Sequence, residues 1–600
     1  MRASVPPMTD TPLLSVESLS VEYGGTRVVD QVSFEVAPGA CLGVIGESGA
    51  GKTQVFLALM GLTTPRARVS GHASLAGVDL FKAQGIRGRE AAMIFQDPMT
   101  ALTPHLRIGD QIAEPLVAHR GASWSDARRR AAQLLEQVRM SDVPRRMRQY
   151  PHELSGGMRQ RAMIAMALAC DPKLLIADEP TTALDVSVQA QILALLRELI
   201  RERNTALAIV THDMGVIAAL ADEVLVVQGG KVLERASASR LFSEPRHEYT
   251  RSLLAATPRM ESTLPPEPKH SGGNTALSIR DLDVRYRLRD GWLRPARAFT
   301  AVESVSLDVV DGEALGIVGE SGSGKSTLTR ALLRLTPAAA GEIVWLGRSL
   351  LELDGEALRR MRDTLQIVFQ DPFASLDPSM SVAECIAEPL RALRPAMSAA
   401  ERGRLVAQML LDVGLDDSFA ARRSPTLSGG QCQRVAIARA MVLSPRLLVC
   451  DEAVSALDVS IQAQILELLA RMRRERGTTL IFVSHNLAVV RQVCDRVAVM
   501  YLGKVVETGS ARSVFEAPRH PYTRMLLASV PLLDPVRERE RLATLAVPGE
   551  TPSAIERPAG CAFRTRCPAA VARCAAASPE PEEAGNAHRV ACFRWRELGN

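Results

Sequence analysis

Two stretches of the sequence have the glycine spacing that lets a backbone wrap around a phosphate group. GESGAGKT spans residues 46–53 and GESGSGKS spans residues 319–326, and both fit the pattern G-x-x-x-x-G-K-[ST]. Each follows an apolar, strand-like run and opens a helical pattern, which is the context that a phosphate-binding loop requires. Glycines let backbone N–H groups approach an anion, and a helix N-terminus favours negative charge. The sequence therefore predicts two phosphate-binding loops.

The side chains of the two loops are candidate ligands of a nucleotide and its metal ion. In such loops the lysine reaches the β- and γ-phosphates and the hydroxyl residue ligates Mg²⁺. These roles fall to Lys52 and Thr53 in the first loop and to Lys325 and Ser326 in the second. The remaining candidate nucleotide contacts are Gly46, Glu47, Ser48, Gly49, Ala50, Gly51, Gly319, Glu320, Ser321, Gly322, Ser323, Gly324 and Thr327.

Two apolar runs end in a pair of acids. LLIADE ends at Asp178 and Glu179, and LLVCDE ends at Asp451 and Glu452. Either run alone could be an ordinary solvated strand end. Beside a phosphate loop, the first acid can hold Mg²⁺ directly or through water, and the second can polarise an attacking water. A general base of this kind typically raises a rate by about 10²–10⁴.

These features repeat along the chain in one register. The separations are 319 − 46 = 273 for the loops, 428 − 155 = 273 for two LSGG segments, 451 − 178 = 273 for the acids and 485 − 212 = 273 for two histidines. The glutamines of two FQDP segments are 370 − 96 = 274 apart. A repeat that keeps its register over so many features indicates two copies of one domain.

The pattern of apolar runs sets the expected fold and boundaries. Short apolar runs alternate with helical patterns, which favours an α/β core with buried parallel strands, and a helical subdomain is expected between residues 96 and 155. The expected parts are a first domain (12–256), a linker rich in Pro, Gly and Ser (257–275), a second domain (276–535) and a C-terminal extension (536–600).

The two LSGG segments point to a family. LSGGMRQR and LSGGQCQR each precede a helical pattern, and Ser-Gly-Gly at a helix start suits an anion. With the phosphate loops, they resemble the signature motif of ABC ATPases. The resemblance implies RecA-like P-loop cores with helical subdomains, and two composite ATP sites in which the signature of one domain closes over the nucleotide of the other. Lys52 would face Ser428, Gly429 and Gly430, and Lys325 would face Ser155, Gly156 and Gly157.

The resemblance also assigns further residues. Gln96 and Gln370 look like Q-loop residues that sense the γ-phosphate and Mg²⁺, and Asp185 and Asp458 look like D-loop residues. His212 and His485 resemble the switch histidine, and each lies 34 positions after its acid (212 − 178 and 485 − 451). Tyr23 is similar to the aromatic residue that stacks on adenine. In the second half either Tyr286 or Phe299 could do so, and Tyr286 is preferred.

Two positions depart from the family pattern. Ala453 stands where the family usually has Pro, and Met158 stands where Gln is commoner. Neither change removes a catalytic group, so both sites are expected to hydrolyse ATP.

Three sequence features resemble the ATPases of oligopeptide and dipeptide importers. They are FQDPFASLDPSM, the pattern P-x-H-x-Y-T-x-x-L-L after each domain, and the tail PGETPSAIERPAGCAFRTRCP. The resemblance implies two separate permease subunits and an extracytoplasmic substrate-binding protein as partners. Nickel, glutathione or a peptide-like antibiotic is the alternative cargo. A twin-ABC translation factor is disfavoured because the linker is short and Pro-rich, and no inserted zinc module suggests a DNA-repair ATPase.

Composition agrees with a peripheral membrane role. The net charge is +5 over 600 residues, too weak an excess to predict nucleic-acid binding. No run of about 18 apolar residues occurs, and the N-terminus lacks a signal-peptide core. The expected location is the cytoplasmic face of the inner membrane, through the permeases.

Ten cysteines divide into two groups. Six are scattered and are expected to be small buried hydrophobic residues. The other four, Cys561, Cys567, Cys574 and Cys592, follow the spacing C-x₅-C-x₆-C-x₁₇-C, which lacks the C-x-x-C pair of a zinc ribbon. Similar cysteines in some peptide-importer ATPases hold an iron–sulfur cluster, so the family resemblance implies a 4Fe–4S cluster here. A packed tail with free thiols is the alternative, and the sequence leaves both open.

Overall fold

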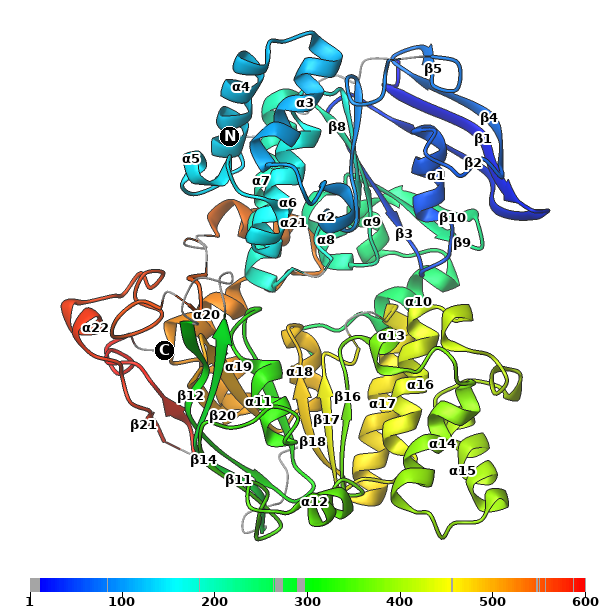
Figure 1. Cartoon of the computed structure of the whole chain (residues 1–600). Helices are drawn as coiled ribbons and strands as arrows, with labels where there is room; N and C mark the ends of the chain where they lie inside the picture. Colours follow the sequence, from blue (N-terminus) through cyan, green and yellow to red (C-terminus); the bar gives the residue numbers. More distant parts are fainter. Residues whose placement is uncertain are drawn as a thin grey trace. The chain divides into compact units, whose positions relative to one another are not determined.

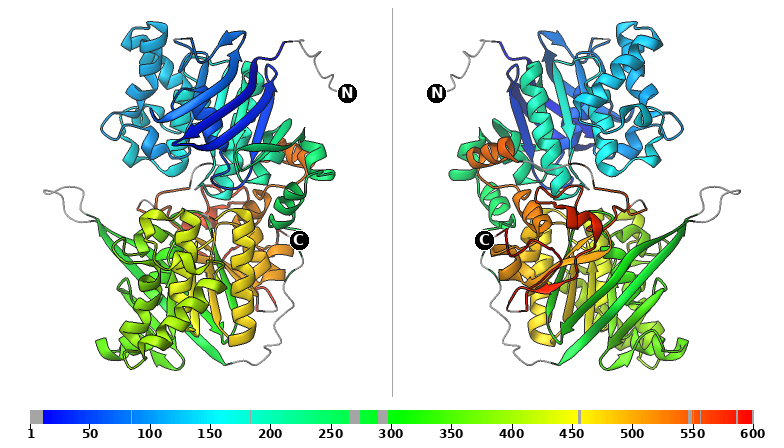
Figure 2. Two further views of the ribbon diagram at one scale, coloured as in Figure 1. Left: turned by 90° about the vertical axis from the view of Figure 1, so that its right-hand side faces the viewer. Right: turned by 90° about the vertical axis from the view of Figure 1, so that its left-hand side faces the viewer.

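The protein is described by a computed structural model that covers residues 11–83, 85–182, 184–262, 264, 274–288, 297–454, 457–545, 549, 551–555, 557–585 and 587–598. It divides into two compact units (Figures 1 and 2). The first unit contains the chain as far as Thr257 together with Pro531–Leu545, and the second contains Pro258–Val530 and Ala546–Asn600.

The centre of the first unit is a six-stranded sheet in the order β10-β9-β3-β8-β7-β6. Its strands are parallel except for β10. Every residue of β3, β7 and β8 is buried, as expected when both faces of a parallel sheet are covered. The strands are β3 (Cys41–Ile45), β6 (Ala91–Ile94), β7 (Leu174–Asp178), β8 (Ala206–Val210), β9 (Glu223–Gln228) and β10 (Lys231–Ser237).

An antiparallel sheet and two groups of helices cover this core. The second sheet has the order β2-β1-β4-β5, and its apolar side packs with α1 against the central sheet. Its strands are β1 (Leu14–Tyr23), β2 (Thr26–Val36), β4 (Ala67–Leu75) and β5 (Val78–Asp79). The helices are α1 (Lys52–Leu59), α2 (Pro98–Ala101), α3 (Ile108–Arg120), α4 (Trp124–Gln137), α5 (Val143–Arg146), η1 (Pro151–Glu153), α6 (Gly156–Ala167), α7 (Val186–Arg203), α8 (Met214–Leu220), α9 (Ala238–Ser243) and α10 (Glu248–Ala256).

The second unit repeats this plan. Its four-stranded sheet, β12-β11-β14-β15, contains β11 (Thr275–Leu288), β12 (Arg297–Val310), β14 (Ala340–Trp345) and β15 (Arg348–Ser349). Its central sheet has the order β16-β17-β18-β13-β19-β20-β22-β21. Those strands are β13 (Ala314–Val318), β16 (Leu365–Val368), β17 (Leu447–Asp451), β18 (Thr479–Val483), β19 (Arg496–Tyr501), β20 (Lys504–Ser510), β21 (Glu582–Glu583) and β22 (Arg589–Val590). The C-terminal extension thus adds β22 and β21 to the edge of the second core.

The helices of the second unit follow a similar order, with α12 as an addition between β15 and β16. They are α11 (Lys325–Leu332), α12 (Gly355–Met361), α13 (Pro372–Ser375), α14 (Val382–Leu393), α15 (Ala399–Asp412), η2 (Asp417–Phe419), η3 (Ser424–Thr426), α16 (Gly429–Met441), α17 (Val459–Arg476), α18 (Leu487–Val493), α19 (Ala511–Glu516), α20 (Pro521–Ala528) and, in the extension, α22 (Ala572–Ala576). The expected α/β fold with helical subdomains is confirmed in both units.

One segment lies in a different unit from the one that its sequence position suggests. Residues 531–535 were expected in the second domain and residues 536–545 in the extension, yet all of them cluster with the first unit. The helix α21 (Pro535–Thr544) packs against α7, α8 and α9, beside which it lies in Figure 1. Leu542 is buried in the first core, and Arg539 donates to the Ala221 carbonyl at 2.5 Å.

The linker also differs from the expected separate segment. Met260 and Leu264 pack against the core of the second unit. The Ser262 carbonyl and hydroxyl accept hydrogen bonds from Arg491 and Gln492 at 3.3 and 3.1 Å. The Pro- and Gly-rich residues 265–273 lie outside the described residues.

Candidate active site

The first phosphate loop lies between β3 and α1. Its strand, β3, is flanked by β8 and β9, so the strand order reverses there, and ligands of open α/β sheets bind at the carboxyl edge of such a point. The ammonium of Lys52 turns back over the loop and donates to the carbonyls of Gly46 (2.7 Å) and Glu47 (2.9 Å). In the second unit Lys325 donates to Gly319 (2.8 Å) and Glu320 (3.1 Å). Both loops therefore have the same folded conformation.

The loop backbone has no room for a side chain at its first glycine. Gly46 has φ 153°, and a Cβ atom there would lie 2.1 Å from the carbonyl oxygen of Val227. Gly319 is equivalent, since its Cβ atom would lie 2.2 Å from the Met500 carbonyl oxygen. The neighbouring strand, β9 beside β3 and β19 beside β13, thus explains why glycine is required at this position in both loops.

Each loop hydroxyl meets the first acid of its pair. Thr53 donates to Asp178 Oδ1 at 3.0 Å, and Ser326 donates to Asp451 Oδ1 at 2.9 Å. Burial raises the pKa of Asp178 to about 6 and also raises that of Asp451. Asp451 is fully buried, and its Oδ2 has no hydrogen-bond partner among the residues that the structure describes. A hydroxyl and a carboxylate oxygen left for a cation are the oxygen donors that Mg²⁺ prefers, so these residues fit the expected ion.

The second acid of the first unit is held by three side chains. Glu179 Oε2 accepts from Gln96 Nε2 (2.7 Å) and Thr182 Oγ1 (3.0 Å), and Oε1 lies 2.9 Å from Nδ1 of His212. Burial opposes ionisation of Glu179, but the hydrogen bond and charge of His212 outweigh it and lower the pKa of the carboxyl. The same hydrogen bond raises the pKa of His212. Glu179 is therefore kept as a carboxylate, the form that a general base requires.

In the second unit, the residues equivalent to Gln96, Glu179 and His212 also lie close together. Gln370 Nε2 donates to Glu452 Oε2 at 2.8 Å, and His485 Nδ1 lies 3.7 Å from that oxygen. Burial is again outweighed, chiefly by His485, so the pKa of Glu452 is lowered. Glu179 has φ 45° and Glu452 has φ 51°, a left-handed backbone that costs about 1–3 kcal/mol in a residue with a side chain and occurs mainly at functional sites.

The signature serines begin long helices. Ser155 is the N-cap of α6 and accepts from the Met158 N–H at 3.4 Å. Ser428 is the N-cap of α16, accepts from the Gln431 N–H at 3.3 Å and donates its own N–H to Gln431 Oε1 at 3.0 Å. The predicted D-loop residues Asp185 and Asp458 occupy the N-cap positions of α7 and α17. Each unit therefore places its predicted signature and D-loop residues at helix starts.

The adenine candidates lie at the ends of equivalent strands. Tyr23 ends β1, and its hydroxyl donates to Gln54 Oε1 in α1 at 2.7 Å. In the second unit Tyr286 and Phe299 are cross-strand partners whose rings stack with centroids 5.6 Å apart. The two candidates of the second half thus form one aromatic pair, and Tyr286 stays the preferred predicted adenine contact with Phe299 as the alternative.

Sequence reasoning missed one residue of each loop's support. The hydroxyl of Tyr249 accepts from the Glu47 N–H at 3.0 Å, and that of Tyr522 accepts from the Glu320 N–H at 2.8 Å. Both tyrosines belong to the P-x-H-x-Y-T pattern, and each lies 202 residues after its glutamate. The occurrence of this pattern after both domains was the available sequence signal that these tyrosines have a role.

A phosphate loop, a hydroxyl–aspartate pair and an ionised glutamate at one sheet edge define a P-loop nucleoside triphosphatase. The family described as "ABC transporter" matches residues 29–182 and 302–455. The family described as "Oligopeptide/dipeptide transporter, C-terminal region" matches residues 233–280 and 506–574. In the described part of the chain, no helix combines the length and apolar character needed to span a bilayer.

Named relatives match nearly the whole chain. The glutathione import ATP-binding proteins GsiA of Escherichia coli strain K12 and Shigella dysenteriae serotype 1 are each 44% identical over 575 residues, which covers 89% of this chain and 92% of the relative. A solved dimeric structure of MJ0796, a bacterial ABC transporter cassette, is 30% identical and covers 39% of this chain and 99% of that chain, with a TM-score of 0.37. The chain belongs to the ABC transporter family, as an importer ATPase of the oligopeptide/dipeptide type.

Proposed function

We propose that this chain energises the import of short peptides, with glutathione as the first candidate cargo, by hydrolysing ATP at two composite sites. The observation that carries the proposal is the 44% identity to GsiA, which extends over both ATPase domains and the C-terminal region. Glutathione is itself a tripeptide, so this cargo agrees with the oligopeptide/dipeptide C-terminal region. Nickel and peptide-like antibiotics are the alternative cargoes.

The two ATP sites are proposed to form head to tail. Lys52 would hold the phosphates of one nucleotide while Ser428 closes over it, and Lys325 would act with Ser155 on the other. Helix N-termini such as those of α6 and α16 attract anions, which supports the signature serines as phosphate contacts. Binding of two nucleotides would then favour the closed arrangement of the two units.

Within each site different residues have different proposed roles. Glu179 and Glu452 orient and deprotonate the attacking water, with Gln96 and Gln370 holding their carboxylates in place. His212 and His485 would contact the γ-phosphate. Mg²⁺, held by the Thr53–Asp178 and Ser326–Asp451 pairs with the Q-loop glutamines nearby, neutralises charge on the phosphates when bound.

The partners follow from the proposed importer. Two permease subunits would span the membrane, and this chain would bind them peripherally at the cytoplasmic face of the inner membrane. An extracytoplasmic substrate-binding protein would deliver the cargo. The family of the named relatives supports this arrangement.

Uptake of labelled glutathione, dipeptides and oligopeptides tests the cargo. Cells lacking their own importer would carry the wild-type chain or the Glu179→Gln, Glu452→Gln double variant. Uptake of one cargo by wild type and its loss in the variant would support the proposal and identify the cargo. Equal uptake of every peptide in both strains would contradict it, and labelled nickel would then be tested.

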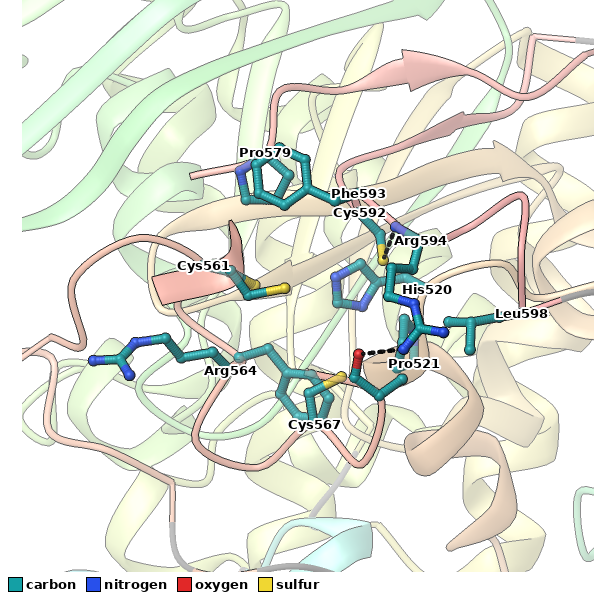
Figure 3. A pocket seen from close by; sticks show the side chains of 13 residues that line it. His520, Pro521, Cys561, Arg564, Cys567, Pro579, Cys592, Phe593, Arg594 and Leu598 are labelled. Atoms are coloured by element: carbon teal, nitrogen blue, oxygen red, sulfur yellow. Dashed lines mark hydrogen bonds between the residues drawn. The ribbon is translucent and has the colours of Figure 1, made fainter. Parts of the chain in front are cut away.

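The C-terminal cysteines are proposed to hold a 4Fe–4S cluster. Cys561, Cys567, Cys574 and Cys592 line one small pocket, and three of their side chains point into it in Figure 3. Burial raises the pKa of three thiols, Cys561, Cys567 and Cys592, and the neighbouring cysteines raise it further.

The four cysteines match the ligand set of such a cluster. A cubane cluster takes four cysteine thiolates, one for each iron, which four thiols around one pocket can supply.

Anaerobic purification tests the cluster. Iron and acid-labile sulfide would be quantified and the sulfur-to-iron absorbance recorded for wild type and for Cys567→Ser, with Cys385→Ser, a buried cysteine of the helical subdomain, as control. Iron and colour lost only in Cys567→Ser would support the cluster. A colourless, iron-free wild-type protein would leave the tail with free thiols.

A further inference from the structure

We propose that the C-terminal extension holds the second phosphate loop in its nucleotide-binding conformation, with Arg566 as a positioning residue that acts through Glu320. The inference rests on the assignment of residues 319–326 as a phosphate loop and goes beyond it, since it gives the extension a role in ATP binding.

A buried ion pair joins the extension to the loop. Glu320 is 1% exposed and Arg566 is 3% exposed. Two guanidinium nitrogens of Arg566 donate to the two carboxylate oxygens of Glu320, at 2.5 and 2.9 Å. Thr551, also in the extension, donates to the same carboxylate at 2.9 Å and accepts from Arg566 at 3.1 Å. Paired arginine–carboxylate bonds of this kind are strong and fix both position and orientation.

Glu320 also contacts Lys325, the lysine of the second phosphate loop, so the position of Glu320 affects that of the lysine. Its backbone N–H donates to the Tyr522 hydroxyl, and its backbone carbonyl accepts from Lys325 Nζ at 3.1 Å. The side chain, amide and carbonyl of one residue are thus all held. If Arg566 is removed, a buried carboxylate loses its counter-charge and must take a proton or move toward water. Movement of Glu320 would displace the carbonyl on which Lys325 rests.

The extension is itself well anchored beside the loop. Phe563 packs against Tyr522 with ring centroids 5.3 Å apart. The guanidinium of Arg557 pairs with Glu303 and with the Thr300 carbonyl of β12. Arg566 therefore projects from a supported segment, as a positioning residue must.

The two loops differ in the burial of this glutamate. Glu47, the equivalent residue of the first loop, is half-buried, whereas Glu320 is buried. Arg566 and Thr551 belong to the same compact unit as Glu320. The loss of Arg566 should consequently act on nucleotide binding at the second loop.

Binding of a fluorescent ATP analogue to the full chain tests this, with one loop inactivated at a time. In a Lys52→Ala background, which leaves the second loop, Arg566→Met should weaken binding about tenfold or more, the size expected when a charge-assisted hydrogen bond is lost. In a Lys325→Ala background, which leaves the first loop, the same substitution should change affinity less than twofold. Arg566→Lys should recover part of the loss because it restores the charge.

A double-mutant cycle separates positioning from general damage. With Glu320→Gln present, Arg566→Met should have a much smaller effect, because no buried carboxylate loses its partner. Unchanged affinity at the second loop, equal loss at both loops, or an effect independent of Glu320→Gln would each overturn the proposal. Full binding in the Lys52→Ala, Lys325→Ala double variant would instead contradict the phosphate-loop assignment itself.

Discussion

At the scale of single residues, the two proposed catalytic glutamates lie at different distances from their histidines. Oε1 of Glu179 lies 2.9 Å from Nδ1 of His212, whereas Oε2 of Glu452 lies 3.7 Å from Nδ1 of His485. Both carboxyls nevertheless have a lowered pKa. Each is ionised near neutral pH, so both centres are equipped to activate water.

Replacement of each glutamate by glutamine tests whether both centres turn over. Glu179→Gln and Glu452→Gln should each lower steady-state ATP hydrolysis, and the double variant should lower it by about 10²–10⁴, because an amide cannot accept the proton. Phosphate release by the purified chain is the measurement. Full turnover in either single variant would show that only the other site hydrolyses ATP.

Residue types and spacing were enough to predict the loops, acids, glutamines and histidines that the structure brings together. They could not predict the backbone of Glu179 and Glu452, because glutamate has no preference for positive φ and tertiary packing must impose it. The Arg566–Glu320 pair was also beyond the sequence, since the partners are 246 positions apart and only the fold of the extension brings them together.

At the scale of elements, the segment containing α21 is the least expected feature. Half of the residues in its sequence, PVRERERLAT, are charged, and the pattern indicates a helix but not the core on which the helix packs. Likewise β21 and β22 have two residues each, too few for an alternating pattern to be recognised. Element types followed from local periodicity, whereas the placement of these late elements depended on long-range packing.

Leu542→Ala tests the docking of α21. Leu542 is 4% exposed in the first core, and removal of a buried leucine side chain typically costs about 2–5 kcal/mol. Hydrogen exchange should therefore speed up in α8 and α9, far from residue 542 in sequence, while the second core is unaffected. Val536→Ala on the same helix is the matched control because Val536 is 60% exposed. Unchanged exchange in α8 would contradict the docking.

At the scale of the whole molecule, one buried histidine makes the stability of the second unit depend on pH. His520 caps α20, its Nδ1 accepts from the Tyr522 N–H at 3.0 Å, and burial lowers its pKa from 6.5 to about 4. Below pH 6.5 the imidazole of His520 binds a proton in the unfolded chain, whereas in the folded unit it stays neutral until the pH approaches 4. Stability should therefore fall as the pH drops from 6.5 to 4, by about 3 kcal/mol at most.

Thermal unfolding of His520→Asn between pH 4 and 7 measures that contribution. Asparagine can still cap the helix but does not titrate, so the unfolding temperature of the second unit should depend less on pH than in wild type. His247→Asn, at the equivalent but half-buried cap of α10, is the control. An unchanged pH profile in His520→Asn would show that other groups cause the acid sensitivity.

The path of the chain has a consequence for how such a protein could be divided. The polypeptide crosses between its units three times, at residues 257/258, 530/531 and 545/546, so the first unit is completed by residues that follow almost all of the second. If the chain were made as two fragments, with the break between residues 264 and 274, the first unit would contain residues from both fragments. We therefore expect the two fragments to bind each other when the first unit folds. Co-purification of the two fragments without nucleotide would show this, and Leu542→Ala should weaken it.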